Sequence, residues 1–182
     1  MSRSDPDHPS GPVTAHEVRT LLASAARHDG IEPLSERFRM QLGTPGAVRV
    51  AASRDAAGAL AAYGSRLADG TIELVVAPAE RRRGHGTAVL RTLLRAGDGT
   101  RATVWAHGNL PPARAFATHH GLVPIRELHK MGRRLDPADA QAPVTFPDGF
   151  RLASFTAGDE DAWLAVTAAA FASHPEQGRV DR

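Results

Sequence analysis

The spacing of apolar residues along the chain predicts helices and strands in alternation. Apolar side chains recur every three or four residues where a helix is expected, and in short or alternating runs where a strand is expected. The expected elements are helices at 15–29 and 35–42, strands at 48–53, 60–66 and 71–76, a helix at 86–95, a strand at 102–106, a helix at 112–119 and one or two strands within 122–131. This order predicts an α/β domain around one sheet.

The last quarter of the chain has a different character. Residues 136–147 are rich in Pro, Ala and Asp, which is typical of a linker. A strand at 150–155 and a helix that opens at 158–160 are expected next, but about 36 residues are too few for a domain of their own. The expected organisation is a disordered leader at 1–12, a folded domain at 13–135, a linker at 136–147, and the truncated start of a second domain at 148–182.

Composition narrows the class of protein. The 182 residues carry a formal net charge of +2 and no cysteine, which excludes disulfides and a cysteine nucleophile. So small a net charge gives no basic field for nucleic acid, and no apolar run reaches the ~20 residues that span a bilayer. His107, His119 and His120 have no His, Asp or Glu partners at metal-ligand spacing. We therefore expect a cytoplasmic monomer with no nucleic-acid, membrane or metal partner.

The sequence Arg81-Arg82-Arg83-Gly84-His85-Gly86-Thr87 is the strongest candidate for a binding site. It lies between a predicted strand and a predicted helix, so its backbone N–H groups would form an anion site at a helix N-terminus. A diphosphate is the natural ligand. The Lys-Ser/Thr of a Walker loop is absent, and so is the third glycine of a dinucleotide fingerprint.

The run from Val75 to Gly86 resembles motif A of the GNAT N-acetyltransferases. The resemblance implies a GNAT fold, with a mixed and mostly antiparallel sheet, helices on both faces and a splayed strand pair at the cofactor site. It also implies acetyl-CoA as co-substrate. The residues it assigns to acetyl-CoA are Leu74, Val75 and Val76 beside the pantetheine, Arg82, Arg83, Gly84, His85, Gly86 and Thr87 at the diphosphate, and Asn109 in a second segment.

Three further segments, at 113–117, 123–131 and 170–178, resemble the mycothiol synthase family of tandem GNAT domains. That family acetylates the cysteinyl amine of a cysteine–glucosamine–inositol conjugate, and its C-terminal domain is the one thought to perform the transfer. The resemblance implies that Glu36 and Glu176 contact the substrate. The alternatives are a solvated helix residue at Glu36 and a helix terminator at His174-Pro175.

The sequence leaves more than one assignment for the catalytic residues. Amine attack on a thioester needs a base, and often a tyrosine that protonates the leaving thiolate. Phe116 stands where many GNAT enzymes carry that tyrosine. Glu73 is a candidate base, with a surface strand carboxylate as the alternative, and His85 is expected to face solvent. Two other functions remain possible: an acyl-CoA-binding domain without activity, and a GNAT acetyltransferase for another small amine.

Overall fold

The computed structural model describes residues 13–44, 48–97, 99, 101–140 and 143–173. The chain divides into two units, 1–127 and 128–182. The predicted leader at 1–12 and the segment that contains Glu176 lie outside the described residues.

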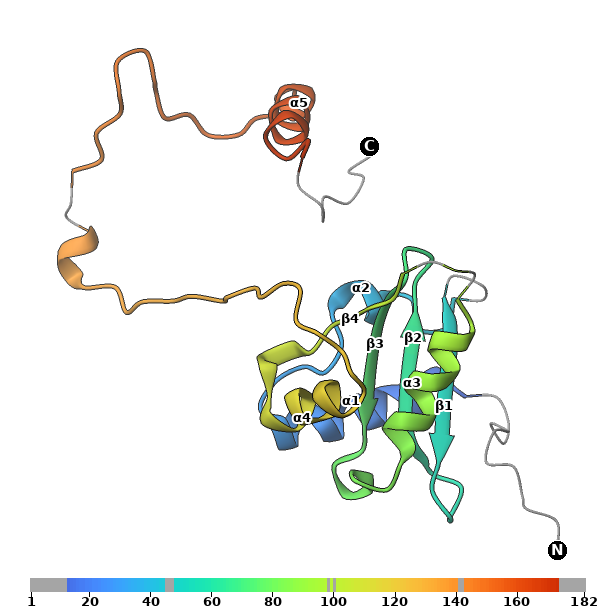
Figure 1. The fold of residues 1–182 in the computed structure, drawn as a ribbon. Coiled ribbons are helices and arrows are strands. Elements are labelled where there is room, and N and C mark those ends of the chain that lie inside the picture. Colours follow the sequence, from blue (N-terminus) through green and yellow to red (C-terminus); the bar gives the residue numbers. More distant parts are fainter. Residues whose placement is uncertain (1–12, 45–47, 98, 100, 141–142, 174–182) are drawn as a thin grey trace, which may run out of the picture. The chain divides into compact units, whose positions relative to one another are not determined.

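The first unit is built on a four-stranded sheet in the order β1-β2-β3-β4 (Figure 1). Its strands are β1 (Arg49–Arg54), β2 (Leu60–Arg66), β3 (Thr71–Val76) and β4 (Thr103–Val104). The first three strands pair antiparallel, and β4 pairs parallel to β3. The mixed, mostly antiparallel sheet predicted from the sequence is thus confirmed, with β4 shorter than predicted.

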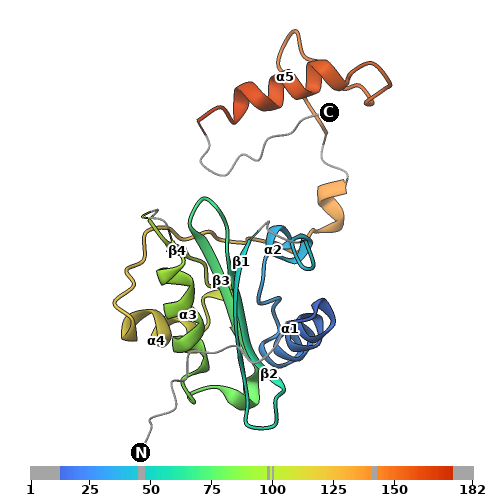
Figure 2. The ribbon, with the colours of Figure 1, turned by 90° about the vertical axis from the view of Figure 1, so that its right-hand side faces the viewer.

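Helices cover both faces of this sheet (Figure 2). On one face α1 (Ala15–Asp29) and α2 (Glu36–Met40) pack against β2 and β3, and on the other α3 (His85–Arg95) packs against β1, β2 and β3. The short helix η2 (His107–Asn109) leads into α4 (Pro111–His119), which lies on the α3 side. The first core layer consists of Val18, Leu21, Leu22, Ala25, Leu34, Phe38, Tyr63, Leu67 and Val75.

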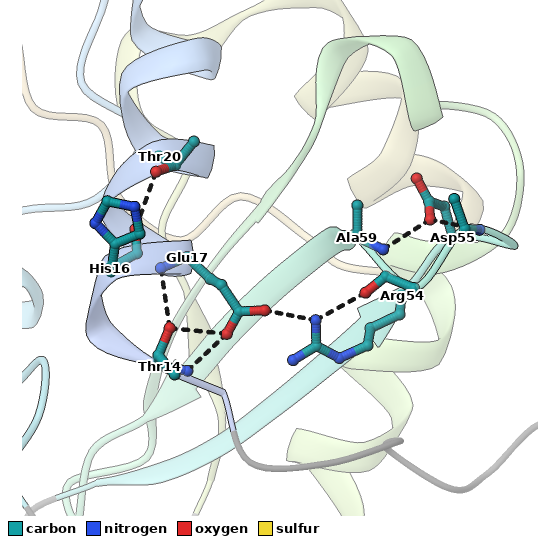
Figure 3. Close-up of polar contacts among 9 residues, drawn as sticks. Thr14, His16, Glu17, Thr20, Arg54, Asp55 and Ala59 are labelled. Carbon is teal, nitrogen blue, oxygen red and sulfur yellow. Dashed lines mark hydrogen bonds and ion pairs between the residues drawn. The ribbon is translucent and has the colours of Figure 1, made fainter.

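The start of α1 is tied to the sheet by a capping box and an ion pair (Figure 3). The Glu17 N–H donates to the Thr14 hydroxyl at 3.2 Å, and the Thr14 N–H donates to the Glu17 carboxylate at 2.9 Å. Arg54 on β1 donates to the same carboxylate at 2.6 Å. The hydrogen bond from Arg54, together with those from Thr14, lowers the pKa of Glu17 to about 2.

Two segments predicted to form strands contain no strand among the described residues. Residues 122–131 and 150–155 form no ladder with any described strand, although the helix predicted after 158 is present as α5 (Glu160–Ala170). Apolar residues are present at strand-like spacing in both segments. A strand also needs a neighbouring backbone to accept and donate hydrogen bonds. Val123 and Ile125 are accordingly 72% and 60% exposed.

Besides α5, the second unit contains the short helix η3 (Pro137–Ala140), and none of its described residues is buried. Thr156 holds the start of α5, because its N–H and its hydroxyl both donate to Asp159 at 2.8 Å. Among the described residues of the whole chain, no helix is long and apolar enough to cross a bilayer.

Acid is expected to remove the stabilisation that Glu17 provides. The folded-state pKa of about 2 lies below the ordinary value of 4.5. This stabilisation is therefore present above pH 4.5 and is lost as the pH falls toward 2. The melting temperature of Glu17→Gln, followed by circular dichroism, should vary less over this range than that of the parent chain.

Glu32→Gln is the matched control, because Glu32 is 56% exposed and, among the described residues, pairs with Arg39 alone, at 3.5 Å. It should keep the parent's pH dependence. Equal pH dependence in Glu17→Gln and the parent chain would contradict the prediction.

Candidate functional site

The N-terminus of α3 presents backbone donors that no side chain caps. Gly84 occupies the cap position with φ of 92°, a left-handed conformation that glycine adopts without strain. The first bond within the helix runs from the Ala88 N–H to the Gly84 carbonyl at 3.0 Å. The N–H groups of His85, Gly86 and Thr87 precede that bond, so they and the positive end of the helix dipole can accept an anion.

The three arginines of this loop have different surroundings. Arg81 makes a bidentate pair with Asp29 at the end of α1, at 2.9 and 2.6 Å, and its hydrogen bonds lower the pKa of Asp29. Arg83 pairs with Glu80 at 3.0 Å. Arg82 is exposed, has a strained φ of 65°, and has no carboxylate partner among the described residues. Arg81 therefore anchors the loop, and Arg82 is available to a ligand.

The gap beside β3 begins where its pairing with β4 ends. The last bond between the two segments is donated by the Trp105 N–H to the Ile72 carbonyl at 3.0 Å. Because backbone groups alternate along a strand, those of Leu74 and Val76 face the same side as those of Ile72. The backbone groups of Val75 instead face β2, on the same side as the Ala77 N–H that donates to the Ala61 carbonyl, and the Val75 side chain lies in the core. The backbone groups of Leu74 and Val76 thus lie beyond the end of the β3–β4 ladder, and the Val76 carbonyl accepts a hydrogen bond from Arg81 Nε at 3.4 Å.

The first turn of α3 packs closely against α4 and β3. A Cβ at Gly86 would lie 3.2 Å from both the Phe116 ring and Val76 Cγ2, so a larger residue would push these side chains away by a few tenths of an ångström. The helix N-terminus consequently lies beside the end of β3, next to the gap. Phe116 packs beside Gly86, at the position where many GNAT enzymes carry a tyrosine.

His120 adds a polar contact at the same junction. Its Nε2 lies 3.0 Å from the Thr87 hydroxyl, and its ring centroid lies 4.5 Å from that of Phe116. Burial, followed by the charges of His119 and Arg91, lowers the pKa of His120. The imidazole at the end of α4 thus holds the Thr87 hydroxyl beside the anion-accepting N–H groups.

The side chain of His85 does not face solvent, which corrects the expectation from the sequence. It is only 16% exposed, and its Nδ1 lies 2.8 Å from the Ser53 hydroxyl on β1. Its Nε2 lies 3.6 Å from Glu80. The helical geometry turns this ring back toward the sheet, so only the backbone N–H of His85 points to the anion site.

The remaining predicted residues lie in different places. Asn109 is exposed at the end of η2 with φ of 46°, and its carbonyl accepts from Arg114 at 2.8 Å. Glu36 is exposed at the start of α2, on the opposite face of the sheet from α3. Glu176 lies outside the described residues. The structure thus brings the predicted loop residues together and leaves Glu36 on the other face.

Glu73 is a buried carboxylate with two partners, and this corrects the alternative of a surface residue. It accepts from the Ser35 N–H at 2.7 Å, and its other oxygen lies 3.1 Å from Nε2 of His107. Its side chain is 3% exposed. Sequence reasoning missed His107, because the two residues are far apart in the chain and meet only through the parallel pairing of β3 with β4.

These features define a class of protein. The sheet is mostly antiparallel and has helices on both faces, and its parallel strand pair ends beside an uncapped helix N-terminus. This arrangement fits a GNAT fold. Among the described residues, no group of three or more His, Cys, Asp and Glu side chains could hold a metal ion.

The chain is a sequence relative of the mycothiol acetyltransferases over nearly its whole length. It is 41% identical to the mycothiol acetyltransferase of Geodermatophilus obscurus, 44% to that of Sanguibacter keddieii and 46% to that of Nocardia farcinica, over 92%, 99% and 91% of this chain. It spans only 57%, 62% and 55% of their lengths. No protein-family model matches the chain. A solved structure from Bacillus halodurans aligns over 67% of the chain with a TM-score of 0.49 and 15% identity.

Removing the anchor of Arg81 should loosen the loop. Asp29→Asn keeps the size of the side chain but removes its negative charge. The Asp29 side chain is only 14% exposed in its ion pair with Arg81. The free energy of unfolding should fall by about 2 kcal/mol, the typical worth of hydrogen bonds between charged groups. Urea denaturation measures this loss.

Asp148→Asn makes the same chemical change at an exposed position and should leave the free energy of unfolding within about 0.5 kcal/mol of the parent value. Equal stability of Asp29→Asn and Asp148→Asn would show that Arg81 does not depend on Asp29.

Proposed function

We propose that this chain is the acetyl-CoA-binding part of an N-acetyltransferase of mycothiol biosynthesis. The acceptor would be the cysteinyl amine of a cysteine–glucosamine–inositol conjugate, acetylated in the last step of that pathway. The observation that carries the proposal is the relationship at 41–46% identity to proteins named mycothiol acetyltransferase.

The geometry of the site supports acetyl-CoA as the co-substrate. The diphosphate would accept from the N–H groups of Gly86 and Thr87 and from the side chain of Arg82, in keeping with the affinity of helix N-termini for phosphate. The pantetheine carries two amides, which would pair with the backbone groups of Leu74 and Val76. Gly84 and Arg83 would form the rim of this loop, and Asn109 would contact the cofactor from η2.

The reaction would be direct transfer. The amine nitrogen attacks the thioester carbonyl, a C–N bond forms, the C–S bond breaks, and the amine's proton finally resides on the coenzyme thiol. The groups required are a proton acceptor and donors for the carbonyl oxygen. Glu36 and Glu176 would contact the acceptor, which carries hydroxyl and ammonium groups that suit carboxylates.

The proposal extends to the organisation of the chain. Residues 13–135 would form the acetyl-CoA-binding domain, 136–147 a linker, and 148–182 the beginning of a second GNAT domain. The match to Sanguibacter keddieii covers 99% of the chain and so includes this last part, which supports a shared organisation. We propose a monomer in the cytoplasm.

A second candidate function is acyl-CoA binding without transfer. It is favoured by the position of the chain's only tyrosine, Tyr63, which is 4% exposed in the core beneath α1. Burial raises the pKa of Tyr63, and the hydrogen bond with Ser65 offsets part of this rise. Together with Phe116 under the loop, this leaves no tyrosine beside the splayed strands to protonate a thiolate.

Mass spectrometry decides between the two functions. The chain would be incubated with acetyl-CoA and the cysteinyl-glucosaminyl-inositol amine, and the acetylated conjugate would be measured against an enzyme-free control. Product formation is the expected result. Calorimetric binding of acetyl-CoA without product would select the second function, and acetylation of other small amines alone would contradict the acceptor.

Arg82→Gln should weaken acetyl-CoA binding about tenfold, since the loss of one charged phosphate contact is of the order of 1.4 kcal/mol. Calorimetry would measure the dissociation constant. The weakening should be smaller in high salt, because Arg82 is exposed and its attraction is screened.

Arg19→Gln, at an exposed position of α1, is the matched control and should bind within about twofold of the parent chain. Equal dissociation constants for Arg82→Gln and Arg19→Gln would contradict the role of Arg82 in the anion site.

A further inference from the structure

The hydroxyl of Thr87 lies beside the turn that would hold the diphosphate. Thr87 is the third residue of α3, and its N–H is one of the donors that precede the first bond within the helix. Side chains on a helix lean toward its N-terminus, so this hydroxyl is directed back toward the loop. It can therefore add one donor to those of the backbone.

Thr87 differs from two other threonines on helices. The hydroxyls of Thr20 and Thr92 donate to the carbonyls four residues earlier in their own helices, at 3.1 and 3.0 Å. Thr87 lies too close to the start of α3 for such a bond, because Arg83, four positions earlier, precedes the cap residue of the helix. Its hydroxyl instead lies 3.0 Å from Nε2 of His120. The hydroxyl proton is therefore not committed to the helix backbone.

The contact between Thr87 and His120 can have either direction. It holds a single proton, which comes from the hydroxyl or from the ring. If Nε2 is bare, the hydroxyl donates to the ring and turns its lone pairs toward the anion site. If Nε2 carries a proton, the ring donates to Thr87 Oγ, and the hydroxyl proton is free for a ligand. The state of His120 thus decides whether Thr87 attracts or repels a diphosphate.

The surroundings of His120 leave both neutral tautomers open. Burial, followed by the charges of His119 and Arg91, lowers the pKa of His120 and so disfavours the doubly protonated ring. Nδ1 has no hydrogen-bond partner among the described residues, so no neighbouring group fixes which nitrogen carries the proton. Phe116 packs against the ring in a tilted arrangement. A ligand at Thr87 can therefore select the tautomer without moving the ring.

We propose that His120 is a positioning residue for the coenzyme: its ring donates from Nε2 to the Thr87 hydroxyl and so directs the hydroxyl proton to the diphosphate. This rests on the proposed acetyl-CoA site, which the relationship to acetyltransferases supports independently of this contact. A diphosphate oxygen only accepts hydrogen bonds, so it stabilises this one direction. Binding of the coenzyme therefore selects the ring with its proton on Nε2.

Calorimetry with acetyl-CoA tests whether His120 acts through Thr87. Thr87→Val removes the hydroxyl and should raise the dissociation constant about tenfold, the order expected for one hydrogen bond to a charged group. His120→Leu should raise it about fivefold, because the hydroxyl remains but loses its orientation. The double variant should also be about tenfold weaker than the parent chain. A weakening of about fiftyfold, the product of independent effects, would overturn the proposal.

Two conservative variants separate hydrogen bonding from the packing of the ring. His120→Gln keeps an amide N–H at about the reach of Nε2 and should bind acetyl-CoA within about twofold of the parent chain. His120→Asn is one carbon shorter, cannot reach Thr87 and should bind as weakly as His120→Leu. A role in packing alone would weaken both amide variants alike, and that result would overturn the proposal.

The matched controls are Thr92→Val on the same helix and His16→Leu on α1, both at exposed positions outside the site. Both should bind within about twofold of the parent chain. Thermal melting would verify that each variant folds. Unchanged binding by Thr87→Val would overturn the proposal while leaving acetyl-CoA binding intact, whereas absence of binding by the parent chain would overturn the proposed function as well.

Nitrogen-15 NMR of the His120 ring gives a readout that a structural role would not change. Addition of acetyl-CoA should increase the population with the proton on Nε2, and Thr87→Val should remove this increase. A bare Nε2 in the saturated complex would overturn the proposal, because the ring could not then donate to Thr87.

Discussion

The early end of the pairing between β3 and β4 is the constraint on which the rest of the site depends. Their ladder contains only Thr71 and Ile72 on β3, and past the bond to Trp105 the strands separate. A continued ladder would use the backbone groups of Leu74 and Val76 and leave no room for an extended ligand. The Val76 carbonyl already accepts a hydrogen bond from Arg81 Nε at 3.4 Å, so the proposed cofactor would use the backbone groups of Leu74 and the N–H of Val76.

The surrounding contacts keep the two ends of this site in place. Arg81 ties the loop to α1 through Asp29, and Gly86 allows α3, α4 and β3 to approach within van der Waals contact. On the opposite face Glu73 joins the start of α2 to His107. The anion-accepting loop and the pair of Glu73 and His107 thus lie at opposite faces of the sheet.

Local patterns were sufficient for part of this picture. The loop of glycines between a strand and a helix, the capping box at Thr14 and the antiparallel strands were predicted because their signals lie within a few residues of one another. The strands expected at 122–131 and 150–155 were wrong, since apolar alternation does not reveal whether a partner strand exists. Spacing in the sequence does not encode tertiary contacts. It therefore could not predict that His85 turns inward to contact Ser53, or that Glu73 pairs with His107.

The central claim is that acetyl-CoA binds along β3 and the N-terminus of α3. Amide NMR during titration with acetyl-CoA tests it most directly, because each backbone N–H reports its own surroundings. The largest shifts should fall on residues 82–87 and on Leu74 and Val76, with little change at Val75, whose backbone pairs with β2. Saturable shifts that spare these residues, or no shifts at millimolar acetyl-CoA, would contradict the account.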